Sequence, residues 1–216
     1  MHERPRVLLI EPPCLFLEGA GLTRQVLPLG LASVGAAVAE QAHVRLLLPD
    51  TRARTTGEPW AMLLAAIAEQ APDVIGMTAV TANFPSAARL AHLIKARWPT
   101  LPIVLGGVHA STLPKEALAA APAVDWLIAG EGELAFAELL HALKVGQGVV
   151  ARPDLIGGLH WRDADGRHHN GPARPPIADL DTLPPPLRDG LVWPQDIQPA
   201  FYQATITLRG CPYRCA

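Results

Sequence analysis

Short apolar segments alternate with helical segments over the first two thirds of the chain, and this alternation limits the possible folds more than any other feature. The apolar segments lack the polar alternation of half-exposed strands, so they are predicted to be strands buried on both faces, as in a parallel sheet. They are Val7–Ile10, Val44–Leu48, Val74–Met77, Ile103–Leu105 and Trp126–Ile128. Apolar residues recur at helical spacing between them, in Leu29–Glu40, Trp60–Gln70, Ser86–Arg97 and Glu133–Leu143. The pattern predicts an α/β fold with a doubly wound, parallel, five-stranded sheet of flavodoxin-like or Rossmann type. Five units fit the flavodoxin-like strand order better than the six-strand dinucleotide order.

The composition changes after residue 146, because ten of the 22 prolines lie in residues 147–216. A β-hairpin is predicted to start at Leu155, with Asp165 and Gly166 at its turn. An extended connector follows at Ile177–Pro186, and Phe201–Leu208 alternates as a strand. We therefore expect three parts: an α/β domain in residues 1–146, a hairpin and Pro-rich connector in 147–200, and the start of a further domain in 201–216.

The charge balance excludes several classes of partner. Lys and Arg number 18 against 20 Asp and Glu, a formal net charge of −2, so the chain lacks the long-range attraction of a basic protein for nucleic acid or anionic lipid. No apolar segment reaches the ~18 residues of a membrane span, and Val7–Ile10 is too short for a signal-peptide core. An odd number of cysteines, three, argues against a disulfide framework. We expect a cytoplasmic protein with no nucleic-acid or membrane partner.

Ligands of doubly wound sheets bind beyond the carboxyl ends of the strands, so the residues after each strand are the candidates for a site. The loop after the first strand, from Glu11 to Gly21, is longer than the usual ~2–6 residues. It contains neither GxGxxG nor GxxxxGK[S/T], which argues against a dinucleotide site or a phosphate loop. Asp50 follows the second strand and could bind a ligand hydroxyl, cap a helix or simply lie on the surface.

Small and polar residues follow the third, fourth and fifth strands. They are Thr78–Ala82, then Gly106, Gly107 and His109, then the sequence Gly-Glu-Gly-Glu at 130–133. Each has a structural explanation: tight packing for the glycines, a hydrogen-bonded scaffold for the histidine, and a helix-dipole contact for Glu133. Their joint place at one edge of the sheet predicts a wide cleft where a backbone approaches a large flat ligand with a deep tail.

Cys211 and Cys215 lie four residues apart after the last predicted strand. A structural zinc site more often uses Cys-x₂-Cys and needs further ligands, whereas soft thiolates on a loop suit an iron–sulfur cluster. Two thiolates cannot hold a cluster, so a further ligand is expected beyond Ala216.

Several motifs together resemble a known family. They are Leu9–Pro13, Pro28–Ala32, Gly106–His109, Val124–Glu133, the connector at 177–184, and Leu208–Cys215 as the opening of a CxxxCxxC motif. The chain resembles the cobalamin-binding radical S-adenosylmethionine enzymes, which join an N-terminal cobalamin domain to a radical barrel. The third cysteine of that motif would fall at position 218, so we expect a chain truncated within the motif that performs no radical chemistry alone.

The resemblance implies cobalamin, a 4Fe–4S cluster and S-adenosylmethionine as cofactors. It makes residues 1–146 the cobalamin-binding domain, 201–216 the start of the radical domain, and Cys211 and Cys215 cluster ligands. The residues implied for the cobalamin tail pocket are Thr78, Val80, Thr81, Gly106, Gly107, His109, Gly130, Glu131 and Gly132. The absent barrel would bind a small-molecule or peptide substrate, and an electron donor would reduce the cluster.

The implied activity of the complete protein is methyl transfer to an unactivated carbon or phosphorus centre. The alternatives are a cyclase or oxidoreductase of the same family without methyl transfer, a stand-alone module that holds cobalamin or a flavin, and a structural domain whose glycines serve packing. Proteins that supply a histidine to cobalt use a DxHxxG motif after the first strand. Because Glu11–Thr23 contains no histidine, we expect none on cobalt; His109, after another strand, is the rival.

Overall fold

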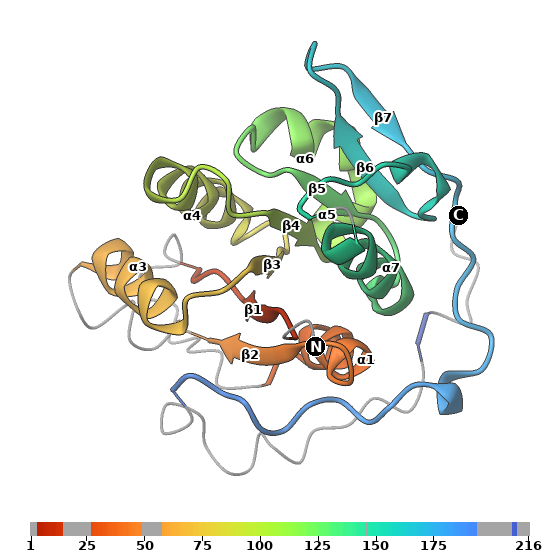
Figure 1. Ribbon diagram of the computed structural model, residues 1–216, viewed down its shortest axis with the longest axis horizontal. Helices are drawn as coiled ribbons and strands as arrows, with labels where there is room; N and C mark the ends of the chain where they lie inside the picture. Colours follow the sequence, from red (N-terminus) through yellow and green to blue (C-terminus); the bar gives the residue numbers. More distant parts are fainter. Residues whose placement is uncertain (1–3, 15–26, 49–57, 146, 194–208, 211–216) are drawn as a thin grey trace.

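A computed structural model describes residues 4–14, 27–48, 58–145, 147–193 and 209–210. They form a seven-stranded sheet in the order β2-β1-β3-β4-β5-β6-β7 (Figure 1). The strands are β1 (Arg6–Ile10), β2 (His43–Leu47), β3 (Val74–Thr78), β4 (Ile103–Gly106), β5 (Trp126–Ile128), β6 (Leu159–Arg162) and β7 (His168–Asn170). The first five pair in parallel in the predicted flavodoxin-like order, and β6 and β7 add to β5 in antiparallel fashion. The predicted hairpin therefore extends the predicted five-stranded sheet; the predicted strand at 201–208 lies outside the described residues.

The four predicted helices are confirmed with small shifts of their ends. The described helices are α1 (Leu29–Val38), α3 (Pro59–Gln70), α4 (Phe84–Arg97), α5 (Val108–Thr112), α6 (Pro114–Ala120) and α7 (Gly132–Val145). Pro59 and Pro114 each lie in the first turn of their helix, where a missing N–H costs little. Two short 3₁₀ turns, η1 (Pro153–Leu155) and η2 (Leu180–Thr182), complete the set.

Alternation along the strands divides the core into two layers. Leu8, Ile75 and Leu105 face α3, α4, α5 and α6, whereas Leu9 and Val104 face α1 and α7. Figure 1 shows α1 and α7 side by side on one face of the sheet and α3 and α4 on the other. Since both faces are covered, the central strands are almost wholly apolar, as their sequences predict. The edge strand β2 differs, because its His43 and Arg45 are exposed.

The hairpin β6–β7 is fixed to the rest of the molecule by Arg162. Its guanidinium donates hydrogen bonds to the carbonyl oxygens of Leu118, Pro122 (2.9 Å) and Val124 (2.7 Å). Asp163 and Gly166 form the turn, where Gly166 has a φ of +79°. Strand β6 begins at Leu159, so the prediction of a strand from Leu155 is wrong at its start: Leu155 belongs to η1, and Gly158, at φ +77°, interrupts the extended backbone.

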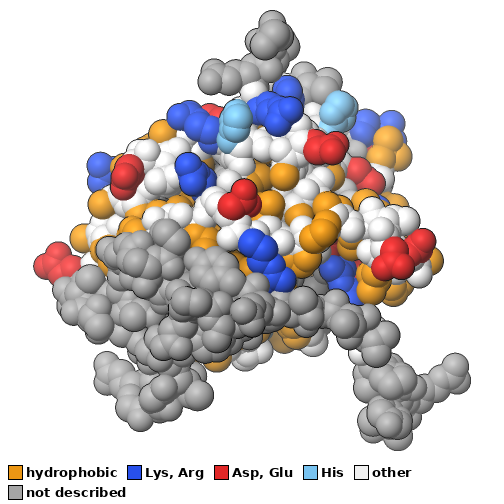
Figure 2. All heavy atoms as spheres, turned by 90° about the horizontal axis from the view of Figure 1, so that it is seen from below, with side chains coloured by type: hydrophobic (Ala, Val, Ile, Leu, Met, Phe, Trp, Pro, Cys, Tyr) orange, Lys and Arg blue, Asp and Glu red, His pale blue; other side chains and the backbone are white. Residues whose placement is uncertain are grey.

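After the hairpin, residues 172–193 run along α1 to the outer edge of β2 (Figure 1). This segment contains the predicted connector at 177–186 and is called the connector from here on. The N–H of Leu187 donates to the carbonyl of Ala32 (3.1 Å), and Leu46 of β2 exchanges backbone hydrogen bonds with Gly190 (3.0 Å) and Val192 (2.9 Å). Figure 2 shows the molecule from below the view of Figure 1. Charged side chains of both signs are spread over the described residues of this face. Among the described residues, no helix has the length and apolarity that crossing a bilayer requires.

Candidate functional site

A cavity of about 290 Å³ lies at the carboxyl ends of β3, β4 and β5, between the sheet and the helices α1 and α7. Its walls are mainly apolar, and its lining includes Leu9, Leu31, Val34, Met77, Val104, Ile128 and Phe136. Polar side chains are few: Thr78, Glu131, Glu133 and Arg209. Its place agrees with the edge at which doubly wound sheets bind ligands.

The cavity exists because glycines occupy strand positions that would otherwise carry core side chains. Gly76 and Gly106 lie on the face of the sheet that Leu9, Val104 and Ile128 also occupy. A Cβ on Gly76 would come within 2.6 Å of Leu9 Cδ2, so Leu9 leans over this glycine. A Cβ on Gly106 would meet the carbonyl oxygen of Ile128 at 3.7 Å, an ordinary contact. A larger side chain at Gly106 would therefore project towards the cavity rather than into packed neighbours.

Two further glycines shape the loops above the cavity. Gly107 and Gly130 have φ values of +94° and +88°, a region that favours glycine. Ser111 of α5 connects the two loops, because its hydroxyl donates to the carbonyl of Gly107 (2.9 Å) and accepts from the N–H of Gly130 (2.9 Å). A Cβ on Gly130 would meet no heavy atom within 4 Å. The backbone is thus bare towards open space at this point of the rim.

One cation meets two carboxylates at the cavity. The Arg209 guanidinium donates to Glu133 Oε1 at 2.6 Å, to Glu131 Oε1 at 3.4 Å and to Ser33 Oγ of α1 at 3.0 Å. Glu133 is only 3% exposed. Burial lowers the pKa of Arg209, but the hydrogen bonds and charges of Glu133 and then Glu131 outweigh it, so the pKa lies above its usual value. Arg209 is therefore a fixed cation here.

Six of the nine residues predicted for the cofactor pocket line this cavity: Thr78, Gly106, Gly107, Gly130, Glu131 and Gly132. The other three, Val80, Thr81 and His109, lie at the same edge of the sheet but not in the lining that the described residues form. His109 Nδ1 is 3.2 Å from Thr81 Oγ1, and its ring lies 4.2 Å from that of Phe84. These contacts fit the hydrogen-bonded scaffold that the sequence left open as an alternative for His109, and its contact with the cofactor stays a prediction.

Other predicted positions fall partly or wholly outside the described residues. Asp50, Cys211 and Cys215 lie outside them, as does most of the loop after β1. Cys14 is within them, half-buried, and its thiol donates to the carbonyl of Ala82 at 3.5 Å. Among the described residues, no three His, Cys, Asp or Glu side chains come together as a metal site.

Several residues that build the site could not be recognised from the sequence. Val34 and Phe136 line it from the two helices, and their apolar helical spacing gave only the signal of ordinary core residues. Asn83 is buried, and its side chain joins the loops after β1 and β3: Oδ1 accepts from Val80 N (2.9 Å) and Nδ2 donates to Pro12 O (2.9 Å). Arg209 had no signal, because its partners lie 76 or more residues away along the chain.

Comparison with known proteins gives a family match: residues 20–140 match the B12-binding domain model. An uncharacterized methyltransferase of Pyrococcus horikoshii is 31% identical over 215 residues, which cover 97% of this chain and 44% of that protein. The cobalamin-dependent radical SAM methyltransferase TokK of Streptomyces tokunonensis is 33% identical over 152 residues, covering 67% of this chain and 21% of TokK. The anaerobic magnesium-protoporphyrin IX monomethyl ester cyclase of Rubrivivax gelatinosus is 33% identical over 148 residues, 67% of this chain and 26% of that enzyme.

A solved structure has the same fold. The cobalamin-dependent S-adenosylmethionine radical enzyme OxsB, with aqua-cobalamin and S-adenosylmethionine bound, superposes with a TM-score of 0.66 at 18% identity, covering 85% of this chain and 24% of OxsB. The chain thus spans less than half the length of each of these four proteins.

Proposed function

The chain belongs to the B12-binding domain family, and on this premise we propose that it is the cobalamin-holding N-terminal region of a radical S-adenosylmethionine methyltransferase. The cavity between the sheet and α1 and α7 would receive the nucleotide arm of cobalamin. The observation that carries this proposal is that the family match, residues 20–140, contains β3, β4, β5, α1, most of α7 and all the glycines that line the cavity. Two relatives named as methyltransferases support the reaction class.

The residues of the cavity fit the arm's chemistry. The arm ends in a flat, largely apolar base, and such a group gains free energy from contact with Leu31, Val34 and Phe136. Gly106 and Gly130 leave bare backbone on two sides, a cradle that side chains would fill. Thr78 adds a hydroxyl that can hydrogen-bond a polar group of the ligand.

Each part of the chain then has a separate task. When bound, cobalamin supplies a cobalt centre that carries a methyl group. Glycines and apolar side chains bind and orient the arm, and the helices α1 and α7 exclude water from it. No histidine is among the described residues that line the cavity. That the protein supplies no histidine to cobalt stays a prediction, based on the sequence Glu11–Thr23.

We propose the predicted division of the chain for the longer protein. Residues 1–146 are the cobalamin-binding domain, 147–200 the hairpin and connector, and 201–216 the start of the radical domain, where Cys211 and Cys215 bind a 4Fe–4S cluster that also binds S-adenosylmethionine. The rest of the protein binds a small-molecule or peptide substrate and meets an electron donor. The cytoplasm is the proposed location, since it keeps the thiols that bind the cluster reduced.

Equilibrium dialysis of the purified chain with hydroxocobalamin tests the proposal. We expect uptake by the wild type and by Gly106→Ala, whose Cβ makes only an ordinary contact. Gly106→Leu fills the cavity, so its affinity should fall at least tenfold, about 1.4 kcal/mol, while its thermal unfolding stays cooperative. Gly30→Leu, at a lining position of α1 where a Cβ meets nothing within 4 Å, is a second way to obstruct the cavity.

Ala65→Leu adds the same side chain to an exposed position of α3 and serves as the matched control, with wild-type uptake expected. Undiminished uptake by both obstructing variants would contradict the assigned cavity. His109→Ala should leave the absorption spectrum of the bound cobalamin unchanged; loss of a nitrogen-ligated spectrum in this variant would show that His109 binds cobalt.

A cyclase is the second candidate function, because relatives of that name from Rubrivivax gelatinosus and Synechocystis are 33% and 28% identical. The two reactions differ in the fate of S-adenosylmethionine in the longer protein that carries this chain. Methyl transfer yields S-adenosylhomocysteine, whereas a cyclase that moves no methyl group yields none. Anaerobic incubation with S-adenosylmethionine and a reductant, followed by mass spectrometry, separates them.

A further inference from the structure

Arg209 lies at the cavity although 76 residues separate it from Glu133. Its guanidinium bridges α1 and α7, since one nitrogen donates to both Ser33 Oγ (3.0 Å) and Glu133 Oε1 (2.6 Å). The other terminal nitrogen lies 3.4 Å from Glu131 Oε1. A planar fork with several donors suits this task, whereas the single ammonium of a lysine does not.

Glu131 and Glu133 are occupied by contacts with later parts of the chain. Besides Arg209, the Glu131 carboxylate accepts a hydrogen bond from the backbone N–H of Ile177 in the connector, at 2.6 Å. Glu133 is 3% exposed and its Oε1 is bonded to Arg209. The Gly-Glu-Gly-Glu sequence therefore holds two downstream segments, in addition to forming the cavity rim.

The burial of the Glu133–Arg209 pair makes separation of the two side chains costly. The Arg209 side chain is 25% exposed, so both charges have lost much of their water. A buried carboxylate left without its cation is costly. The folded domain thus favours the state in which Arg209 is bound, more than an exposed ion pair would.

We propose that Arg209 is a positioning residue that joins α1 to α7 at the cavity, so that the bound guanidinium and a ligand in the cavity stabilise each other. Ser33, Glu131 and Glu133 form the receptor for Arg209. The guanidinium also belongs to the cavity lining, so a ligand that fills the cavity meets it directly. The inference rests on the proposed function in one respect, the binding of the cobalamin arm in this cavity.

Limited proteolysis of the whole chain tests the contact directly, because trypsin cleaves after an arginine only when that side chain can enter the protease. The peptide bond after Arg209 should be cut at least tenfold more slowly than the bond after Arg167, whose side chain is 76% exposed. Glu133→Gln keeps the shape and removes the charge, and should speed cleavage after Arg209 about tenfold. Cleavage after Arg167 should not change, and circular dichroism reports whether the variant folds.

Glu138→Gln is the matched control. Glu138 belongs to the same helix and pairs with Arg174 instead, so its loss should leave cleavage after Arg209 at the wild-type rate. Saturating hydroxocobalamin should slow cleavage after Arg209 a further threefold or more in the wild type and not in Glu133→Gln, because the ligand and the bound arginine complete the same cavity. A purely structural salt bridge would not respond to the ligand.

The outcomes separate this inference from the proposed function. Cleavage after Arg209 as fast as after Arg167, or unchanged by Glu133→Gln, contradicts the positioning role even if hydroxocobalamin is taken up. Faster cleavage on addition of hydroxocobalamin also contradicts it, since the ligand would then displace Arg209. Absence of uptake together with Glu133-dependent protection contradicts the proposed function and supports the contact itself.

Discussion

At the scale of single residues, the neighbouring glycines Gly106 and Gly107 are needed for different structural reasons. Gly106 leaves space for a ligand, and its backbone is in an ordinary conformation. Gly107 is required by the backbone: its φ is +94°, and a Cβ would lie 2.6 Å from Thr78 Oγ1 and 2.7 Å from the backbone N and O of Ala79. A substitution at Gly107 therefore reports on folding, and only one at Gly106 reports on the cavity.

We expect Gly107→Ala to lower the free energy of unfolding by roughly 1–3 kcal/mol. The alanine would have to adopt a positive φ, and its Cβ would clash with backbone atoms of Ala79 that cannot move aside. Gly106→Ala should change it by less than about 1 kcal/mol. Urea denaturation followed by circular dichroism measures both. Equal stabilities of the two variants would show that the loop after β4 relaxes around the new methyl group.

Residue types predict the edge of the sheet where the cavity lies, but not its walls. Glycine and threonine directly after buried strands signal a site, and Thr78, Gly106, Gly130 and Glu131 do line the cavity. Arg209 could not be found in this way, because only the folded chain brings it beside Glu133. The same signal placed Thr81 and His109 in the pocket, although they hydrogen-bond each other outside the lining of the described cavity.

At the scale of elements, strands and long helices follow from the sequence because burial and periodicity act locally. The short helices α5 (Val108–Thr112) and α6 (Pro114–Ala120) are too short to show a helical period. The pairing of the hairpin β6–β7 with the edge of the parallel sheet was also not predicted. It depends on the long-range hydrogen bonds of Arg162 and on the pairing of β5 with β6, as between Trp126 and Trp161.

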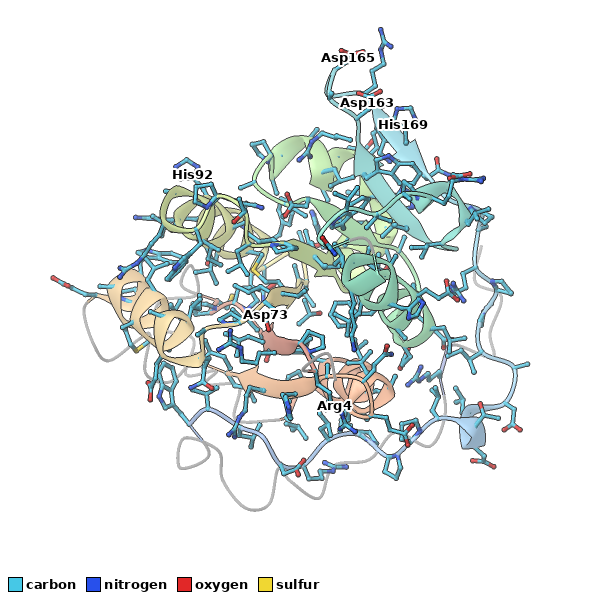
Figure 3. The ribbon with its side chains drawn as sticks, in the orientation of Figure 1. Arg4, Asp73, His92, Asp163, Asp165 and His169 are labelled. Carbon is cyan, nitrogen blue, oxygen red and sulfur yellow. The ribbon has the colours of Figure 1, made fainter. Side chains whose placement is uncertain are left out.

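The hairpin carries a histidine pair, for which we expect a stability that depends on pH. His160 Nδ1 and His168 Nε2 lie 3.0 Å apart, and their rings stack at 5.2 Å. Burial, and then the charge of His168, lowers the pKa of His160. Burial, then the charges of Lys115 and His169, lowers the pKa of His168 against a smaller opposite effect of Glu116. Figure 3 shows His169 beside Asp163 near the tip of the same hairpin, where their side chains pair at 2.7 Å.

Since the unfolded chain has ordinary histidines, it binds more protons than the folded chain between the lowered pKa values of the pair and a pH of about 6.5. The stability from the neutral pair is complete above that pH and is lost as the pH falls through the lowered pKa values. We expect the thermal midpoint of the wild type to drop more between pH 7.5 and 5.5 than that of His168→Gln. His92→Gln, on the exposed side of α4 (Figure 3), should keep the wild-type pH dependence; identical profiles for all three proteins would contradict the role of the pair.

At the scale of the whole molecule, the chain after the hairpin joins the two edges of the sheet. It leaves β7 at one edge, contacts Glu131 through Ile177 and α1 through Leu187, and reaches β2 at the other edge (Figure 1). There Leu191 forms a parallel bridge with Leu46 and is 9% exposed. The connector therefore covers the edge strand β2, which would otherwise present unpaired backbone groups. It also crosses the side of the molecule on which α1 and α7 enclose the cavity.

We expect Leu191→Ala to lower the free energy of unfolding by about 2 kcal/mol, because it removes a buried leucine that packs in the layer of α1 and α7. The local effect should be larger: the N–H groups of Leu46 and Val192, which bond across the bridge, should exchange with deuterium much faster. Exchange of the N–H groups of β3 and β4 should speed up only as far as the global stability falls. Leu155→Ala, at a leucine that is 64% exposed, is the control and should alter neither quantity. Unchanged exchange at Leu46 in Leu191→Ala would mean that the connector is held to β2 by its other contacts, and that the sheet edge is closed independently of the layer around the cavity.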